Sequence, residues 1–141
     1  MGKINMGRVI LGGIVAGIVS DLLGYLVDGV LLAPRWAGAM GALGRPEFTT
    51  NQIVDFNLLG IVAGIALIWI YAAIRPRFGA GPATAVLAGI AVFIIGSLIP
   101  NLGFMWVPYL FPHHLTLYTT IGNLVETVAG ALAGAALYKE A

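Results

Sequence analysis

Two carboxylic acids lie deep inside apolar stretches of this chain. Asp21 is near the middle of the stretch 9–32, and Glu126 is near the middle of the stretch 118–138. An acid at the centre of a bilayer costs roughly 2.5–3.5 kcal/mol, so such a residue is a candidate for function. Neither stretch contains a Lys or Arg that could pair with it. We therefore expect these acids to be protonated, to hydrogen-bond to polar neighbours, or to hold a cation.

Further polar residues lie toward one end of each apolar stretch. On a helix, Gly17, Asp21, Gly24 and Asp28 share one face, because their spacing is four, three and four residues. The same spacing argument groups polar residues with glycines in 53–74 and 118–138. We expect these faces to turn toward other helices and to form one polar site. Its predicted ligand-binding residues are Asp21, Asp28, Asn57, Asn101, Asn123 and Glu126.

Small residues spaced four apart predict close helix packing. Such faces let backbones approach each other, which is how membrane helices associate without a hydrophobic drive. They pack helices within one subunit or between subunits, and we expect a compact bundle that also forms oligomers. The predicted packing glycines are Gly13, Gly17, Gly60, Gly64, Gly130 and Gly134.

Adjacent histidines, His113 and His114, raise the alternative of a metal site in a loop. Histidine is the commonest metal ligand, but a site needs three or four ligands, which Asp28, Asp55 or Glu126 would have to complete. The other interpretation is a polar and aromatic loop at the membrane boundary. The chain has no spacing typical of zinc, haem or iron–sulfur binding and no nucleotide-binding motif, so no cofactor is implied.

The composition places most of the chain in lipid. Of its 141 residues, 60% are hydrophobic and 9% are charged, against about 25% charged in an average soluble domain. The net charge of +1 provides no field that would attract nucleic acid. With no cysteine, the chain has neither disulfides nor thiol chemistry. We expect a single integral membrane domain, 1–141, with the bilayer as its main partner.

Four stretches are long and apolar enough to span a bilayer, which takes roughly 20 residues. Prolines and charges bound them, as in Arg75-Pro76-Arg77, and the first is too long for a signal-peptide core. The N-terminus, the middle loop and the C-terminus hold five of the seven Lys and Arg residues, so these parts are predicted to be cytoplasmic. The fold class is thus an all-α bundle of four transmembrane helices with spans 9–32, 53–74, 83–106 and 118–138, N-in and C-in.

The spans also suggest an internal repeat. Each carries a similar tripeptide, such as Val15-Ala16-Gly17 in the first and Leu87-Ala88-Gly89 in the third. The second and fourth align through Asn57 and Asn123. This predicts two tandem helical hairpins in parallel repeat. The alternative is that a chain with 20 glycines aligns with itself through composition alone.

The stretches RWAGAMGALG (35–44) and IYAAIRPRFGAGP (70–82) resemble those of small four-span bacterial membrane proteins to which no function is assigned. The resemblance implies a multi-pass protein of the bacterial inner membrane. Small multidrug-resistance transporters are also short and four-span, but they keep their membrane-embedded Glu in the first span. Here the first span carries Asp21 and the Glu is in the fourth, so that function does not transfer.

Three functions follow as expectations. The leading one is a binding or transport protein whose polar, acidic pocket opens outward and takes a cation, a proton or a small polar molecule. The second is an accessory or scaffolding subunit of a larger membrane complex, held through the glycine faces. The third is a membrane metalloenzyme that uses His113 and His114; an enzyme is the less favoured class.

Overall fold

The computed structural model describes residues 3–107 and 110–141, and every element in this part of the chain is helical. The elements in chain order are α1 (Met6–Gly24), η1 (Tyr25–Leu31), α2 (Ala33–Ala42), α3 (Thr50–Phe78), α4 (Pro82–Phe93), η2 (Ile94–Leu98), α5 (Ile99–Trp106) and α6 (His113–Ala136). Here η marks a π-helical stretch. No strand occurs in the described residues.

Helix α1 starts at a side-chain cap and changes its winding at Gly24. The Asn5 side chain accepts a hydrogen bond from the Arg8 amide at 3.2 Å, which satisfies one of the free amides of the first turn. In η1 the backbone hydrogen bonds reach the carbonyl five residues earlier, where an α-helix reaches the one four residues earlier. The Leu32 N–H, for example, donates to the Val27 carbonyl at 2.8 Å. The widened winding alters which way the residues after Gly24 face. π-helical stretches are frequent at functional sites.

Helix α3 is longer than the predicted span 53–74. A capping box of Thr49 and Gln52 begins it, and Gly79, with φ of 86°, ends it. The prediction that Pro76 marks a boundary is wrong, because Pro76 lies inside α3. Proline within a helix near a membrane is tolerated where its neighbours satisfy the freed backbone groups.

The loop regions contain two further departures from the expected spans. Residues 33–42 form helix α2, with Pro34 in its first turn, where a missing amide costs nothing. Helix α6 begins at His113, before the predicted span 118–138, and ends at Ala136. His113 and His114 are therefore the first two residues of a helix and do not lie in a loop.

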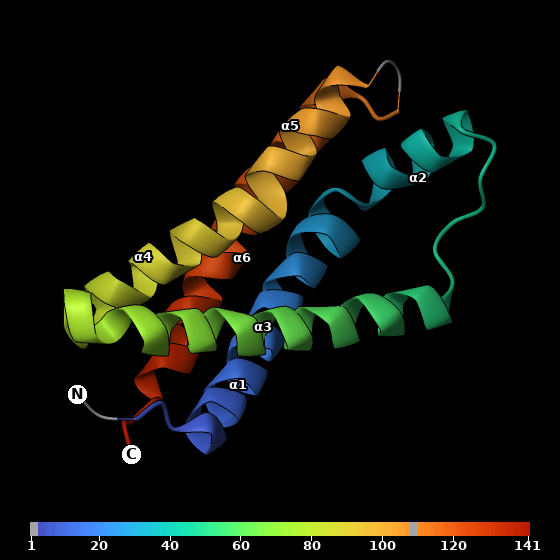
Figure 1. Cartoon of the computed structure of the whole chain (residues 1–141). Helices are drawn as coiled ribbons and strands as arrows, with labels where there is room; N and C mark the ends of the chain where they lie inside the picture. Colours follow the sequence, from blue (N-terminus) through green and yellow to red (C-terminus); the bar gives the residue numbers. More distant parts are fainter. Residues whose placement is uncertain (1–2, 108–109) are drawn as a thin grey trace.

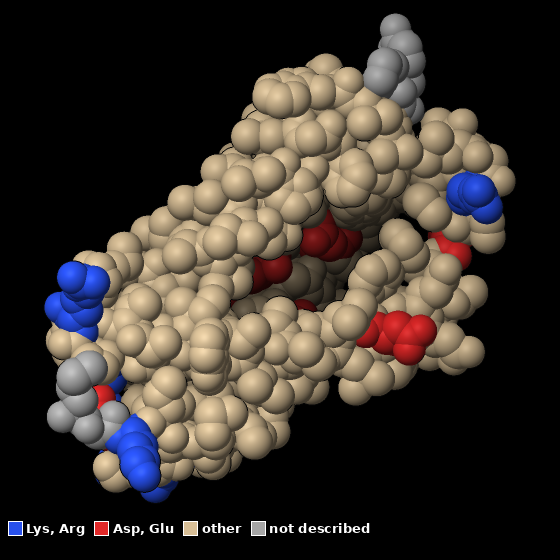
Figure 2. Space-filling model, in the orientation of Figure 1, with Lys and Arg blue, Asp and Glu red and all other residues tan. Residues whose placement is uncertain are grey.

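The chain passes back and forth between two ends of an elongated molecule (Figure 1). The two termini and the α3–α4 turn lie at one end, which we call the basic end. Here the Ala141 amide donates to the Lys3 carbonyl at 3.4 Å, and Arg75 pairs with Glu140 at 3.5 Å. Most of the Lys and Arg side chains visible in Figure 2 gather there. Helix α2 and the segment between α5 and α6 lie at the opposite end.

Glycines bring α1 into close contact with two helices. A Cβ on Gly13 or Gly17 would collide with the backbone of α3 at Ile65 and Ile61, and one on Gly64 would collide with α1. On its other side, α1 meets Gly130 and Gly134 of α6 through the Ala16 and Gly12 carbonyls. All six predicted packing glycines are thus occupied by contacts within this chain.

Two apolar clusters lie along the bundle, with a gap between them. The larger, near the basic end, contains Val9, Ala16, Ile68 and Ala131. The smaller, at the α2 end, contains Leu32, Ala39 and Leu115. The acids of α1, η1 and α6 fall between these clusters along the chain.

In the part of the chain that the structure describes, three helices are able to cross a membrane by length and composition: Met6–Leu31, Thr50–Phe78 and Pro82–Trp106. These correspond to the first three predicted spans. Helix α6 has 24 residues, but its first half carries threonines, an asparagine and Glu126, and it is not among the three. It packs against both α1 and α4.

Candidate functional site

The surface is hollowed between α3 and the α4–α5 arm, and acidic side chains lie inside the hollow (Figure 2). Helix α3 and the α4–α5 segment meet at the α3–α4 turn and diverge toward the α2 end. Helices α1 and α6 pass between them (Figure 1). Asp21, Asp28 and Glu126 are the acids that α1, η1 and α6 contribute. We call this region the acidic hollow.

Asp21 faces α3 at a glycine. A Cβ on Gly60 would collide with the Asp21 carboxylate, so the absence of a side chain at Gly60 makes room for the acid. Asp21 is half-buried. The predicted face of α1 that joins Gly17 to Asp21 does turn toward another helix, and that helix is α3.

Glu126 lies between two glycines of different helices. A Cβ on Gly24 of α1 would come within 3.3 Å of its Oε2, and one on Gly122 of α6 within 3.3 Å of its Oε1. Its Oε1 is buried and has no hydrogen-bond partner in the described part of the chain. The Ser20 hydroxyl donates to the Glu126 carbonyl at 3.0 Å, and Gly24, which lies beside the Glu126 carboxylate, stands between Asp21 and Asp28 in the sequence. The three acids are therefore carried by adjoining stretches of α1, η1 and α6.

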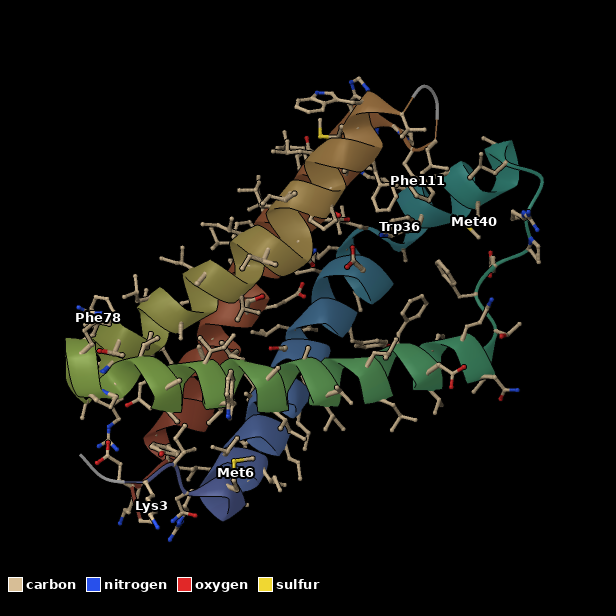
Figure 3. The ribbon with its side chains drawn as sticks, in the orientation of Figure 1. Lys3, Met6, Trp36, Met40, Phe78 and Phe111 are labelled. Carbon is tan, nitrogen blue, oxygen red and sulfur yellow. The ribbon has the colours of Figure 1, made fainter. Side chains whose placement is uncertain are left out.

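Asp28 is held by two donors. The Trp36 indole N–H of α2 donates to its Oδ1 at 2.9 Å, and the Thr119 hydroxyl of α6 donates to the same oxygen at 3.0 Å. Trp36 also lies edge-on to Phe111, with ring centroids 5.3 Å apart, and Figure 3 shows these two side chains near each other at the α2 end. Asp28 thus joins η1 to α2 and α6 through one oxygen.

The three predicted asparagines have different surroundings. Asn101 donates to the Thr120 hydroxyl at 2.8 Å and so ties α5 to α6. Asn57 is exposed, and its amide donates at 2.6 Å to the Ile53 carbonyl of its own helix. Asn123 is half-buried on α6, one turn before Thr127, whose hydroxyl donates to its carbonyl. The structure gives Asn57 and Asn101 partners of their own and does not link them to the acids.

His113 and His114 lie at the start of α6 and are exposed. The His114 ring is 6.4 Å from the Tyr118 ring, edge-on. Among the described residues, no three His, Cys, Asp or Glu side chains form a group that could hold a metal ion. The histidines border a separate pocket, which is described below.

Sequence reasoning did not identify Trp36 and Thr119 as partners of Asp28. Trp36 lies eight residues beyond Asp28, across a break between η1 and α2, so helical spacing does not link them. Thr119 lies 91 residues away. The only usable signal was chemical: a carboxylate near a membrane boundary needs donors, and the indole N–H is one.

Comparison of the chain with protein-family models, with curated proteins and with solved structures finds no match.

Proposed function

We propose that this chain is a small integral membrane protein that binds a cation, a proton or a small polar molecule in the acidic hollow, as part of binding or transport. The observation that carries the proposal is the contact of α6 at Glu126 and Thr119 with the stretch of α1 and η1 that carries Asp21 and Asp28, beside a hollow with acidic side chains inside it (Figure 2). An isolated acid in a bilayer is unfavourable, and three that interact are more so unless something positive joins them.

A positive ligand fits better than an anion because the hollow has no cation of its own. The one ion pair in the described part of the chain, Arg75 with Glu140, is at the basic end. The unpartnered Oε1 of Glu126 is an acceptor that lacks a donor. A proton, a metal cation or an ammonium group would each supply what is missing.

The four-span topology, N-in and C-in, is part of this proposal. A helix of 24 residues is about 36 Å long, against about 30 Å for the hydrocarbon core. Helix α6 is less apolar than the others but packs against α1 and α4, and Thr120, Gly122 and Ala131 on it are buried. Two contacts support a crossing of α6 alongside α1: the Ala141 amide donates to the Lys3 carbonyl at one end, and the Thr119 hydroxyl donates to Asp28 near the other. Location in the bacterial inner membrane rests on the resemblance and on the charge asymmetry.

The duplicated hairpin is also supported by matching contacts. A Cβ on Gly17 would meet α3 at Gly60 and Ile61, and one on the aligned Gly89 would meet α6 at Thr127 and Val128. When Asn57 is aligned with Asn123, the residues of α3 that Gly17 contacts and the residues of α6 that Gly89 contacts are offset by one position. Both first helices of the hairpins also contain a π-helical stretch. Similar packing registers in the two hairpins support duplication over a chance likeness of composition.

The experiment is a comparison of Glu126→Gln with the unchanged protein in detergent and in proteoliposomes. Thermal shifts would be measured with Na⁺, K⁺ and Mg²⁺, and proton uptake with an entrapped pH dye. We expect the wild-type response to one of these probes to fall about tenfold or more in the variant, because an uncharged amide replaces the acid. Glu47→Gln is the matched control, since Glu47 is an exposed acid before α3. An equal response in Glu126→Gln would remove Glu126 from the site.

A second candidate, an accessory subunit, is favoured by the first third of α3. Residues 50–59 are exposed on every side of the helix, including Phe56 and Leu59. A partner subunit would cover them. This function predicts a co-purifying protein and tolerance of Asp21→Asn combined with Glu126→Gln. Loss of function in that double variant, without loss of folding, would speak against it.

A further inference from the structure

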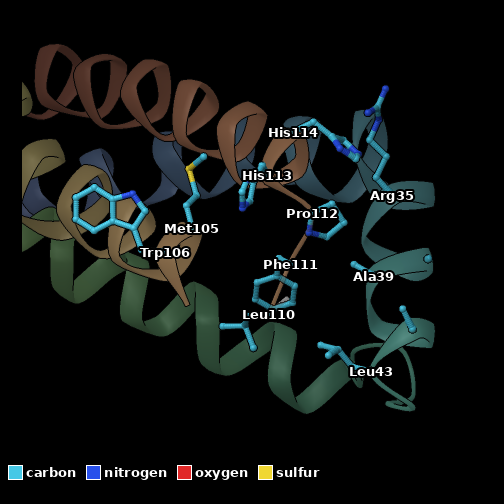
Figure 4. Close-up of a pocket in the computed structure, with 12 residues that line it drawn as sticks. Arg35, Ala39, Leu43, Met105, Trp106, Leu110, Phe111, Pro112, His113 and His114 are labelled. Atoms are coloured by element: carbon cyan, nitrogen blue, oxygen red, sulfur yellow. The ribbon is translucent and has the colours of Figure 1, made fainter. Parts of the chain in front are cut away.

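A second cavity lies at the α2 end of the molecule, apart from the acidic hollow. Its volume is about 880 Å³, within the range of small-molecule sites, and it lies between α2, the end of α5 and the start of α6 (Figure 4). We call it the α2 pocket. Its twelve lining residues are Arg35, Gly38, Ala39, Ala42, Leu43, Met105, Trp106, Leu110, Phe111, Pro112, His113 and His114.

The α2 pocket combines an apolar wall with a basic edge. Nine of the twelve lining residues are apolar or glycine, three are Arg or His, and none is acidic. Figure 4 shows Arg35 and His114 near each other where α2 meets α6, with Met105 and Trp106 on the opposite side. The acidic hollow and the α2 pocket therefore have opposite electrostatic character.

Arg35 has charge available for a ligand. Its guanidinium lies 5.0 Å from the centroid of the Tyr118 ring, and the described residues place no carboxylate within ion-pair distance of it. A guanidinium stacked on an aromatic ring keeps its N–H donors free at the edges, in a fork that matches phosphate. Imidazole N–H groups of His113 and His114 donate whether or not the rings are charged.

The start of α6 adds backbone donors to the same edge. Leu115 and Thr116 amides both donate to the Pro112 carbonyl, at 3.0 and 3.2 Å. His113 and His114 are the first two residues of α6, where the backbone amides of a helix point out of its end. The helix dipole places partial positive charge there as well.

We propose that the α2 pocket binds the anionic headgroup of a membrane phospholipid, with Arg35, His113 and His114 on the phosphate. The position favours a lipid over a free anion, because the pocket lies where three apolar, membrane-length helices begin or end. Its apolar wall matches the first carbons of the acyl chains, which a free phosphate lacks. Trp106, 81% exposed beside it, is the type of residue that sits at headgroup level.

The test uses the full chain in detergent with added phosphatidylglycerol or phosphatidylcholine, read by native mass spectrometry. We expect phosphatidylglycerol to be retained over phosphatidylcholine, and Arg35→Gln to lower its affinity about tenfold, the loss of one charge-assisted contact. Arg45→Gln is the control, because it removes the same charge near the same end from a residue that does not line the pocket. An equal loss in Arg45→Gln would overturn the proposal.

Two further measurements test the same proposal, a competition with inorganic phosphate and a second variant. Millimolar inorganic phosphate should not displace the lipid; displacement would make the site one for a free anion and overturn the lipid assignment. If Arg35→Gln fails to fold by circular dichroism, His113→Asn with His114→Gln carries the test, since both side chains are exposed. Unchanged lipid retention in that folded double variant would also overturn it. Neither arm touches Asp21 or Glu126, so the cation-binding proposal is tested separately.

Discussion

At the residue scale, the glycines differ in what a side chain would meet. A Cβ on Gly13 would meet the backbone of Ile65, which is fixed within α3. A Cβ on Gly60 would meet the carboxylate of Asp21, the far end of a side chain that can rotate. A Cβ on Gly38 of α2 would meet nothing within 4 Å. The same substitution should therefore have three different effects.

Gly13→Ala is expected to destabilise the protein by about 1–3 kcal/mol, because the helices must separate to accept the methyl group. Gly38→Ala, at an exposed helical position, should be neutral or stabilising by up to about 1 kcal/mol. Thermal unfolding in one detergent would compare them. Equal melting temperatures for the two variants would mean that α1 and α3 do not pack as closely as these contacts require.

Gly60→Ala should act on the acidic hollow more than on the fold. The added methyl group displaces the Asp21 carboxylate from α3, so cation response should change while stability falls by less than in Gly13→Ala. The thermal shift with Na⁺, K⁺ and Mg²⁺ measures both quantities in one experiment. A large loss of stability with an unchanged cation response would place Asp21 outside the binding site.

At the element scale, α2 is attached to the rest of the molecule by few contacts. Trp36 donates to Asp28 and packs on Phe111, while Ala39 joins the small apolar cluster with Leu32 and Leu115. Most other residues of α2 are exposed. The orientation of α2, and with it the α2 pocket, therefore depends on a few side chains: Trp36, Ala39 and Arg35, which lies over the Tyr118 ring.

Trp36→Phe should loosen α2 without unfolding the helices that pack around α1. The ring still contacts Phe111, but the indole donor to Asp28 is lost, and removing one partner of such a hydrogen bond costs about 1–3 kcal/mol. Hydrogen exchange should rise in 33–42 and stay low in α1 and α6. Trp106→Phe is the control, because Trp106 is 81% exposed on α5. Uniform exchange in both variants would show that α2 is held by other contacts.

The elements also show how far the sequence reasoning reached. Apolar length and flanking charge predicted the helices near 9–32, 53–74 and 83–106 because desolvation favours internally bonded helices wherever a stretch is apolar. The spacing of Gly17 and Asp21 correctly indicated a face turned toward a neighbouring helix. Beyond Gly24 the i, i+4 rule loses its register, because η1 bonds Leu32 to Val27, five residues apart. The bonds of Asp28 to Trp36 and Thr119 depend on this tertiary arrangement and not on local spacing.

At the scale of the whole molecule, the basic residues gather at the end where the direction of the helices brings the termini and the α3–α4 turn together. Lys3, Arg75 and Lys139 belong to the segments that meet at the basic end, and α1, α3, the α4–α5 arm and α6 each lead from one end toward the other (Figure 1). The larger apolar cluster lies next to the basic end, so the acidic hollow opens away from it. A ligand would enter from the α2 side, and passage onward would require the helices to move.

This arrangement predicts which segments face each side of the membrane. Cysteine labelling can test it, because the chain has no cysteine of its own. Single cysteines at Ala80, Lys139 and Glu47 would have no background, and all three positions are exposed. In oriented membrane vesicles, an impermeant maleimide should label Ala80→Cys and Lys139→Cys from the same side and Glu47→Cys from the other, because in the proposed four-span topology α3 crosses between Glu47 and Ala80, and α6 crosses before Lys139. If Lys139→Cys were labelled together with Glu47→Cys, α6 would not cross the bilayer, Glu126 would lie outside its centre, and the energetic reason for a cation in the acidic hollow would be lost.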